Sequence, residues 1–304
     1  MGDVNNVALV GSTGLLGKAI YEMLKSNGYE VVGVARKNAD FNFDIKNDDA
    51  LRDFLLSNKF CVVINAVAIV NHEICDNNPA LAYLVNSRPS AIFAQLSKEL
   101  DFKYVYISTD GYFHGDKNFK HCEDANVSFF NEYVRTKFAG EQFALTNPNS
   151  LVVRTNIVGF KGATSPTFFE WALNAVKNQE NITLFEDYFT SSISTAQFSS
   201  ALLDLINKDA KGLYNVASSE VSSKKQFIEK MAEIFNLELI NAKIGSVSSL
   251  NSKRADSLGL DVSKAEKLLG YKMPGLRDVL EKLKEEYYEL QKCNICRKKK
   301  NSNR

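Results

Sequence analysis

Three side chains near the middle of the chain have the types and spacing of a proton-transfer set. Tyr133 and Lys137 are four residues apart in a stretch that is predicted to be helical, so both side chains lie on one face. A free phenol has a pKa of about 10, and a neighbouring ammonium lowers that pKa toward the range where proton transfer is efficient. Thr109 closes a predicted strand at residues 104–107, where its hydroxyl could orient a carbonyl oxygen. The set predicts interconversion of a ketone and an alcohol, with Tyr133 as the acid–base group.

A glycine-rich turn near the N-terminus could hold the redox cofactor that this chemistry needs. A strand-like run at residues 7–10 leads into the turn at 11–17, GSTGLLG, and then into an apolar helix. Glycine lets backbone N–H groups approach phosphate oxygens, and a helix N-terminus adds free donors and partial positive charge. In this strand–turn–helix context the turn predicts a dinucleotide diphosphate site. The residues predicted to form it are Gly11, Thr13, Gly14, Leu15, Leu16 and Gly17.

The end of the second predicted strand bears on which dinucleotide is bound. The strand at 31–34 is followed by Ala35, Arg36 and Lys37, without a carboxylate. A carboxylate here would repel a ribose 2′-phosphate, whereas the Arg36 guanidinium could bind that phosphate or stack on adenine. A solvated basic turn is the alternative interpretation. We expect NADPH as the cofactor, with NADH possible.

Short apolar strands alternate with helices through the first half of the chain. Strands are predicted at 7–10, 31–34, 61–65, 104–107 and 151–153, and helices at 15–27, 48–57, 79–100 and 132–147. Continuously apolar strands separated by helices are typical of a parallel sheet that is covered on both faces. We predict an α/β fold, a doubly wound parallel (Rossmann) sheet with a smaller C-terminal α/β substrate lobe. The predicted parts are a sheet domain at 1–155, joined again by a segment at about 190–220, a smaller lobe at 156–290, and a basic disordered tail at 291–304.

Length and charge exclude several classes of protein. A chain of 304 residues is long enough for a main domain and a smaller lobe. The formal net charge of +1 gives no general attraction to nucleic acid or to a membrane surface. No apolar run approaches the roughly 20 residues that cross a bilayer, and residues 1–6 do not resemble a secretory signal. We expect a cytoplasmic protein that binds neither nucleic acid nor membrane.

The cysteines and histidines lack the spacing of a metal site. The five cysteines are odd in number and irregularly spaced, which argues against a disulfide framework. Cys293 and Cys296 have the two-residue gap of zinc sites, but no second pair completes four ligands. We therefore predict reduced thiols and no metal. Surface or loop positions are expected for His72, His114 and His121.

A series of strings in order resembles a known enzyme family. The strings are FDI at 43–45, NAVA at 65–68, LAYLVN at 81–86, STDGYFHG at 108–115, YVRTKFAGE at 133–141, Arg254, and LDVSK at 260–264. Together with the GxxGxxG turn they resemble the extended short-chain dehydrogenases/reductases, and among these the dTDP-4-dehydrorhamnose reductases. The resemblance runs from about residue 6 to residue 285.

The resemblance implies roles at positions that match the family's motifs. It implies that Thr109, Tyr133 and Lys137 are the catalytic residues. The further cofactor-binding residues that it implies are Asp44, Ile45, Asn65, Ala66, Val67, Ala68, Asn86 and Ser108, with Tyr133 and Lys137. The substrate-binding residues that it implies are Asp110, Gly111, Tyr112, Asn156 and Arg254. The chain departs from the pattern at Ile157, where the family has tryptophan, and at Gly111 and Tyr112, where it has Tyr-Val.

The resemblance implies an NAD(P)H-dependent reductase of a nucleotide-activated 4-keto-6-deoxy sugar. A homodimer is a possible assembly of the chain. One alternative is a nucleotide-sugar epimerase or dehydratase with tightly bound NAD. Dehydratases of this superfamily have an Asp-Glu pair after the threonine, whereas Gly111 follows Asp110 here. A second alternative is a non-catalytic regulatory subunit like the beta subunit of methionine adenosyltransferase, which the presence of Thr109, Tyr133 and Lys137 together disfavours.

Overall fold

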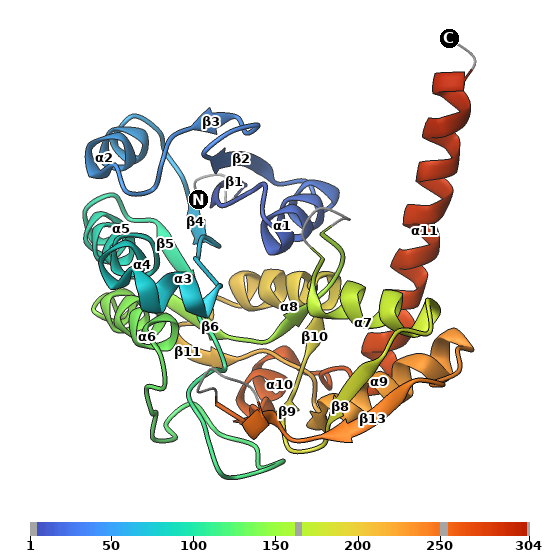
Figure 1. The fold of residues 1–304 in the computed structure, drawn as a ribbon. Coiled ribbons are helices and arrows are strands. Elements are labelled where there is room, and N and C mark those ends of the chain that lie inside the picture. The colour runs from blue at the N-terminus through green and yellow to red at the C-terminus, as the bar shows by residue number, and fades with distance from the viewer. Residues whose placement is uncertain (1–4, 162–165, 250–254, 303–304) are drawn as a thin grey trace.

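The computed structural model (Figure 1) describes residues 5–161, 166–249 and 255–302, and for residues 293–302 it describes the backbone alone. Its central sheet has seven strands, and each neighbouring pair is parallel. In spatial order these are β11 (Gly212–Asn215), β6 (Leu151–Arg154), β5 (Lys103–Ile107), β4 (Val62–Asn65), β1 (Asn6–Val10), β2 (Glu30–Ala35) and β3 (Phe41–Asn42). The order runs outward in both directions from β1 and β4, so the predicted doubly wound parallel sheet is confirmed.

Alternate residues of each strand point to opposite faces of the sheet, and both faces are covered by helices. Along β1, Val7 and Leu9 belong to one apolar cluster, whereas Ala8 and Val10 belong to the other. Figure 1 shows α4 (Pro79–Asn86), α5 (Arg88–Glu99) and α6 (Glu132–Leu145) gathered on one side. The first cluster includes side chains of α1 (Leu15–Ser26) and α8 (Thr195–Asn207), and the second includes those of α2 (Asp48–Leu56), α4 and α5. Burial on both faces explains why the strands read as continuous apolar runs.

The helix predicted at 79–100 is two helices. α4 ends at Asn86 and α5 begins at Arg88, with Ser87 between them. Pro89 lacks a backbone N–H and its ring clashes with the preceding turn, so one continuous helix cannot pass through this point. The break matters for the site because it leaves Asn86 at the end of α4, facing the loop after β4.

A smaller set of strands and helices lies beyond β6, at the end of the sheet where the strands have their carboxyl ends. β7 (Ile157–Val158) pairs with β10 (Ile193–Ser194), and β8 (Ile182–Phe185) pairs with β13 (Ala242–Gly245). β9 (Phe189–Thr190) lies between β12 (Ser222–Ser223) and β14 (Ser257–Leu258). The helices of this part include α7 (Phe168–Lys177), α9 (Lys224–Phe235) and α10 (Ser263–Leu269), and a short helix η1 spans Val247–Ser249.

The last helix, α11 (Leu276–Ser302), projects from the body of the molecule in Figure 1. The sequence predicts a disordered tail at 291–304, but the backbone stays helical to Ser302. Residues 276–302 contain neither proline nor glycine and are rich in Leu, Glu and Lys, which favour helix even without packing. Within the described residues, no helix is both long and apolar enough to cross a bilayer.

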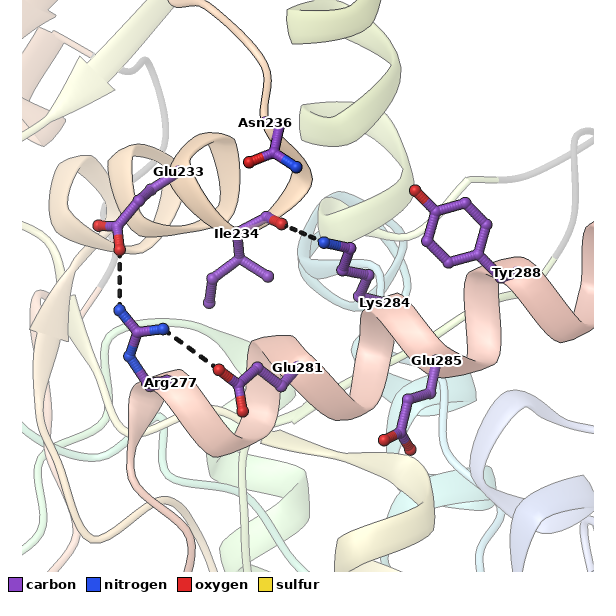
Figure 2. Close-up of a pocket in the computed structure, with 8 residues that line it drawn as sticks. All are labelled: Glu233, Ile234, Asn236, Arg277, Glu281, Lys284, Glu285 and Tyr288. Carbon is purple, nitrogen blue, oxygen red and sulfur yellow. Dashed lines mark hydrogen bonds and ion pairs between the residues drawn. The ribbon is translucent and has the colours of Figure 1, made fainter.

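A surface groove of about 580 Å³ separates α9 from α11 (Figure 2). Arg277 bridges the two helices, at 2.8 Å from Glu233 and 3.2 Å from Glu281. The Lys284 ammonium donates to the Ile234 carbonyl at the end of α9, at 2.6 Å. The groove is therefore lined by charges that already have partners, and its contacts fasten α11 to α9.

Candidate active site

The glycine turn is too tight for side chains at its key positions. Gly11 has a φ of +92°, and a Cβ added there would lie 3.0 Å from the Val67 side chain. At Gly17, on the first turn of α1, an added Cβ would lie 2.0 Å from the Gly11 carbonyl oxygen. Such a distance is impossible for a real side chain, so glycine lets α1 begin directly against the turn. The N-terminal donors of α1 are thereby held at the carboxyl end of β1, next to β4, where the strand order reverses and such folds bind their ligands.

A cavity of about 370 Å³ opens beside this turn, and it contains much of the predicted cofactor site. Its lining includes Gly11, Thr13, Gly14, Arg36, Asp44, Ile45, Ala66, Val67 and Ala68, all of which were predicted from the sequence. It also includes residues that the sequence analysis did not assign: Val10, Val34, Ala35, Phe43, Lys46, Ile69, Leu81 and Val85. The cavity thus joins the turn to the ends of β2 and β4, with two cationic side chains, Arg36 and Lys46, in its wall.

Two predicted cofactor residues, Asn65 and Asn86, lie outside the cavity lining and hold the loop that lines it. The Asn65 side chain accepts a hydrogen bond from the Val67 N–H at 3.1 Å. Asn86 is fully buried, accepts from the Ile69 N–H at 2.8 Å and donates to the Ile69 carbonyl at 3.2 Å. These bonds hold the loop 66–69 that lines the cavity. The structure does not place Leu15, Leu16, Gly17, Ser108, Tyr133 or Lys137 in the cavity lining.

Tyr133 and Thr109 meet at the carboxyl end of β5. The Asn131 side chain caps α6 by accepting from the Val134 N–H at 3.0 Å, which puts Tyr133 on the first turn of that helix. The Tyr133 phenol hydrogen-bonds with the Thr109 hydroxyl. Burial raises the pKa of Tyr133 to about 12, an effect that the Thr109 hydrogen bond opposes and the Asp110 charge reinforces. The predicted pairing of these two residues is present in the geometry.

Lys137 lies one turn further along α6 and is buried. Its ammonium donates to the Ile107 carbonyl at 2.6 Å and lies 4.2 Å from the centre of the Tyr106 ring. Burial lowers the pKa of Lys137 to about 7, although the Glu141 charge raises it. Because the ammonium is bound by the β5 backbone, the lowering of the Tyr133 pKa by Lys137 stays a prediction.

His72 packs against the tyrosine that the sequence predicts as the proton donor. It begins α3 (His72–Asn77), and its ring stacks on Tyr133 with centres 5.1 Å apart and planes inclined by 19°. Its Nδ1 lies 3.3 Å from the Asn131 amide. The sequence analysis placed His72 on a surface or loop, because nothing in its spacing indicates contact with a residue that is 61 positions away.

The substrate-side predictions divide into those the structure brings together and those it does not. Asp110 follows Thr109, is almost fully buried, and accepts from the Asn156 amide at 2.7 Å. A side chain at position 111 would clash with Val134 of α6, since a Cβ there would lie 2.7 Å from the valine methyl group. This explains why glycine follows Asp110. Asp110, Gly111 and Asn156 therefore lie together beside Thr109.

Tyr112 is a core residue and does not face a substrate surface. Its side chain is fully buried, and its hydroxyl lies 3.0 Å from Ser108 Oγ. The Arg154 guanidinium lies 5.0 Å from its ring centre, and Ser108 also donates to Glu141 at 2.9 Å. These buried contacts thus take up both Tyr112 and Ser108, which corrects the sequence prediction for Tyr112. Arg254 lies outside the described residues.

Lys224, which the sequence analysis did not single out, reaches the same place from α9. It is buried, and its ammonium lies 4.1 Å from the centre of the Phe168 ring. Burial lowers its pKa to about 8, whereas the Asp110 charge raises it. The chain separation of more than a hundred residues explains why sequence spacing could not connect Lys224 with Asp110.

The histidines and cysteines form no metal centre in the described residues. His114 lies 3.1 Å from Asp256, and His121 is buried with its Nε2 at 3.1 Å from Asp116. Cys75 is buried, and burial raises its pKa to about 11.

Comparison with known proteins identifies the family. The family model "RmlD substrate binding domain" matches residues 5–289. The chain belongs to this family. It is 26% identical over 284 residues, 90% of this chain and 95% of the relative, to the probable low-salt glycan biosynthesis reductase Agl14 of Haloferax volcanii.

Two further relatives show how widely this fold is used. The chain is 25% identical to methionine adenosyltransferase 2 subunit beta of Xenopus laevis, over 90% of this chain and 86% of the relative. The crystal structure of dTDP-4-dehydrorhamnose reductase from Bacillus anthracis, in complex with NADP, superposes with a TM-score of 0.83 at 25% identity, covering 93% of this chain and 99% of that one. The family match and the NADP complex agree with the prediction of an oxidoreductase that uses a dinucleotide.

Proposed function

We propose that this protein is an NADPH-dependent reductase of a nucleotide-activated 4-keto-6-deoxy sugar. The observation that carries the proposal is the hydrogen bond between Tyr133 and Thr109 at the carboxyl end of β5, two strands from the glycine turn at the end of β1. Neighbouring strands are about 4.8 Å apart, so the two sites lie about 10 Å apart along the sheet edge. That span suits a cofactor whose diphosphate sits at the turn and whose nicotinamide reaches the tyrosine.

The dinucleotide fits the residues that line the cavity. The turn has no room for a side chain at Gly11 or Gly17, so α1 begins directly beside the cavity. The N–H groups of Gly11, Ser12 and Gly14 bond to backbone carbonyls, so the diphosphate would be held by the first N–H groups of α1, which have no partner within the helix. Arg36, Asp44 and Lys46 line the same cavity, and the Lys46 ammonium lies 3.5 Å from the Asp44 carboxylate. The Arg36 guanidinium therefore provides the positive charge that a ribose 2′-phosphate needs. Bound NADPH supplies the hydride. This charge is the reason to favour NADPH over NADH.

Three residues then act on the ketone oxygen. Thr109 holds the carbonyl oxygen with its hydroxyl, and Tyr133 donates its phenolic proton as negative charge develops on that oxygen. Lys137 orients the ribose of the cofactor and stabilises the phenolate once its ammonium leaves the Ile107 carbonyl. Positioning and charge stabilisation at one oxygen supply most of the rate.

The substrate class rests on the relatives. Agl14 is described as a reductase of glycan biosynthesis, and the Bacillus anthracis relative as a dTDP-4-dehydrorhamnose reductase. The test is a screen of nucleotide-4-ketosugars with NADPH and with NADH, following the absorbance of the reduced cofactor. Oxidation that depends on a ketosugar and is faster with NADPH supports the proposal. NADPH binding without oxidation by any ketosugar would contradict it, and would favour a regulatory role like that of the Xenopus laevis subunit. A homodimer and a cytoplasmic location stay predictions.

A further inference from the structure

An unbroken series of hydrogen bonds, buried at the Lys224 end and partly buried at Asn156, connects Lys224 in the smaller lobe to Asp110 beside the catalytic threonine. The Lys224 ammonium donates to Thr190 Oγ1 at 3.4 Å, and Thr190 Oγ1 lies 3.1 Å from Ser192 Oγ. Ser192 donates to the Asn156 side-chain oxygen at 2.7 Å, and the Asn156 amide donates to Asp110 Oδ2 at 2.7 Å. The series therefore crosses from one lobe to the other and ends on a carboxyl group.

The ammonium at its start sets the direction of the whole series. An ammonium has three donors and no acceptor, so Thr190 must accept from Lys224 and its own hydroxyl is free to donate to Ser192. Ser192 then donates onward to Asn156, which fixes the amide nitrogen toward Asp110. Oδ2 of Asp110 is thus an acceptor, and a proton on this carboxyl group resides on the other oxygen, Oδ1.

Asp110 Oδ1 is the oxygen that faces Thr109. Thr109 Oγ1 lies 3.4 Å from it, and the same hydroxyl hydrogen-bonds with the Tyr133 phenol. The Gly111 N–H donates to Thr109 Oγ1 at 3.2 Å and helps to hold the hydroxyl between them. Carboxyl, hydroxyl and phenol thus form a line that ends at the group that must give up a proton.

Asp110 can carry a proton near neutral pH. Burial raises its pKa to about 7, against the opposing effects of the Asn156 hydrogen bond and the Lys224 charge. The titratable groups that face it are Lys224 from α9 and Tyr133 from α6. Tyr133 is in turn faced by Cys75 and His72, both from α3.

We propose that Asp110 is the proton reservoir that restores Tyr133 during ketone reduction, and that the hydrogen bonds from Lys224 orient it for this task. When the ketone oxygen takes the phenolic proton it becomes an alcohol and releases the Thr109 hydroxyl. The phenolate then takes the Thr109 hydroxyl proton, and Thr109 takes the proton of Asp110 Oδ1. One O–H bond breaks and one forms at each transfer. Asp110 ends as a carboxylate and regains a proton from water after the product leaves. The proposal rests on the function proposed above.

The first test needs neither cofactor nor substrate. Infrared difference spectra of the ligand-free protein between pH 5 and pH 9 (about two units either side of the expected midpoint) report the C=O stretch of protonated carboxyl groups. Burial raises the pKa of Glu286 to about 7 as well, so the measurement uses Glu286→Gln as background. We expect a band with a midpoint of about 7. Asp110→Asn should remove this band, and the exposed control Asp101→Asn should retain it. A spectrum that Asp110→Asn leaves unchanged overturns the proposal, whatever the enzyme reduces.

The second test is kinetic. Asparagine keeps the acceptor for Asn156 but cannot supply a proton, so Asp110→Asn should lower kcat about 10- to 100-fold. The KM for the ketosugar should stay within about threefold, because substrate binding does not consume the proton. In the wild type kcat should fall as pH rises through about 7, and this limb should be absent in the variant. Unchanged kcat and pH profile in Asp110→Asn would refute the reservoir. If the wild type reduces no ketosugar, the proposed function fails, while the infrared result still decides the state of Asp110.

A third variant tests the orienting series. Lys224→Met removes the positive charge that lowers the pKa of Asp110, so the midpoint of the infrared band should move to higher pH. Lys225→Met, at the next position of α9, should leave it unchanged. An equal midpoint in both variants would show that Lys224 does not act on Asp110.

Discussion

Two charged regions of this protein differ in how their charges are surrounded. In the groove between α9 and α11, Arg277, Glu233 and Glu281 are each about half exposed and directly paired. At the carboxyl end of β5, Asp110 and Lys224 are almost fully buried, and no direct ion pair joins them in the described residues. The groove of about 580 Å³ is larger than the cofactor cavity of about 370 Å³, yet the residues proposed to act on the cofactor and the ketone lie in or near the smaller one.

The difference shows that the pKa of a charged group depends more on its burial than on the number of charges around it. Water solvates exposed ion pairs, so they contribute little to stability. Hydrogen bonds from Lys230 and Arg277 lower the pKa of Glu233, which only keeps that group charged. Burial penalises the charged form, which moves the pKa values of Asp110 and Lys137 to about 7 and that of Lys224 to about 8. Groups with such values exchange protons readily under physiological conditions. Size and charge alone would have selected the groove in place of the site proposed above.

The largest expected effect is at the phenol. Tyr133→Phe removes the proton donor and should lower kcat about 10³-fold while NADPH affinity stays within about threefold. Tyr288→Phe makes the same change in the groove and should leave kcat at the wild-type value. Stopped-flow turnover and fluorescence titration with NADPH measure the two quantities. Wild-type activity in Tyr133→Phe would show that this phenol is not the proton donor, and the functional contrast between the site and the groove would fail.

The directly bonded ion pair of Arg154 and Glu141 is buried, and we expect its loss to lower the free energy of unfolding. Arg154 and Glu141 are buried, with Nη2 and Oε1 2.6 Å apart. Arg154→Met leaves a buried carboxylate without its partner and should cost about 3–5 kcal/mol of unfolding free energy. Urea unfolding measures this cost, and the double variant Arg154→Met/Glu141→Gln should recover part of it. No recovery in the double variant would mean that packing, and not charge, accounts for the loss.

Lys137 should make the stability of the ligand-free protein depend on pH. Its pKa is about 7 in the folded state and 10.5 in the unfolded state, so between these values the unfolded chain binds the proton and the folded one does not. The free energy of unfolding therefore rises with pH across this window because of Lys137. Lys137→Met should flatten the rise in unfolding experiments at several pH values, whereas the exposed Lys98→Met should not. The same slope in both variants would contradict the buried state of Lys137.

The smallest effect is expected in the groove. Arg277→Ala breaks both exposed ion pairs at once, yet water replaces the lost partners. Its melting temperature and kcat should equal those of the wild type within error, by calorimetry and by turnover assay. A marked loss of activity would show that the groove is coupled to the site at the carboxyl end of β5.

Much of the sheet domain was predictable because its patterns are local. Apolar strand runs, helix periodicity and the spacing of glycines depend on neighbours a few residues away, so the strands, the turn at 11–17 and the Tyr133–Lys137 spacing could be read directly. One error was local as well, because Pro89 divides the helix predicted at 79–100. In the segment predicted as a disordered tail, the backbone of α11 stays helical to Ser302.

What the sequence determined by itself is the class of fold and the chemical types at the site: a glycine turn for a diphosphate, a phenol, an ammonium and a threonine hydroxyl. Tertiary structure alone decided which groups meet. It stacks His72 on Tyr133, buries Tyr112 in the core, and brings Lys224 from α9 toward Asp110. The physical reason is that proton affinities and hydrogen-bond direction depend on burial and on partners distant in the chain, and no local spacing encodes either.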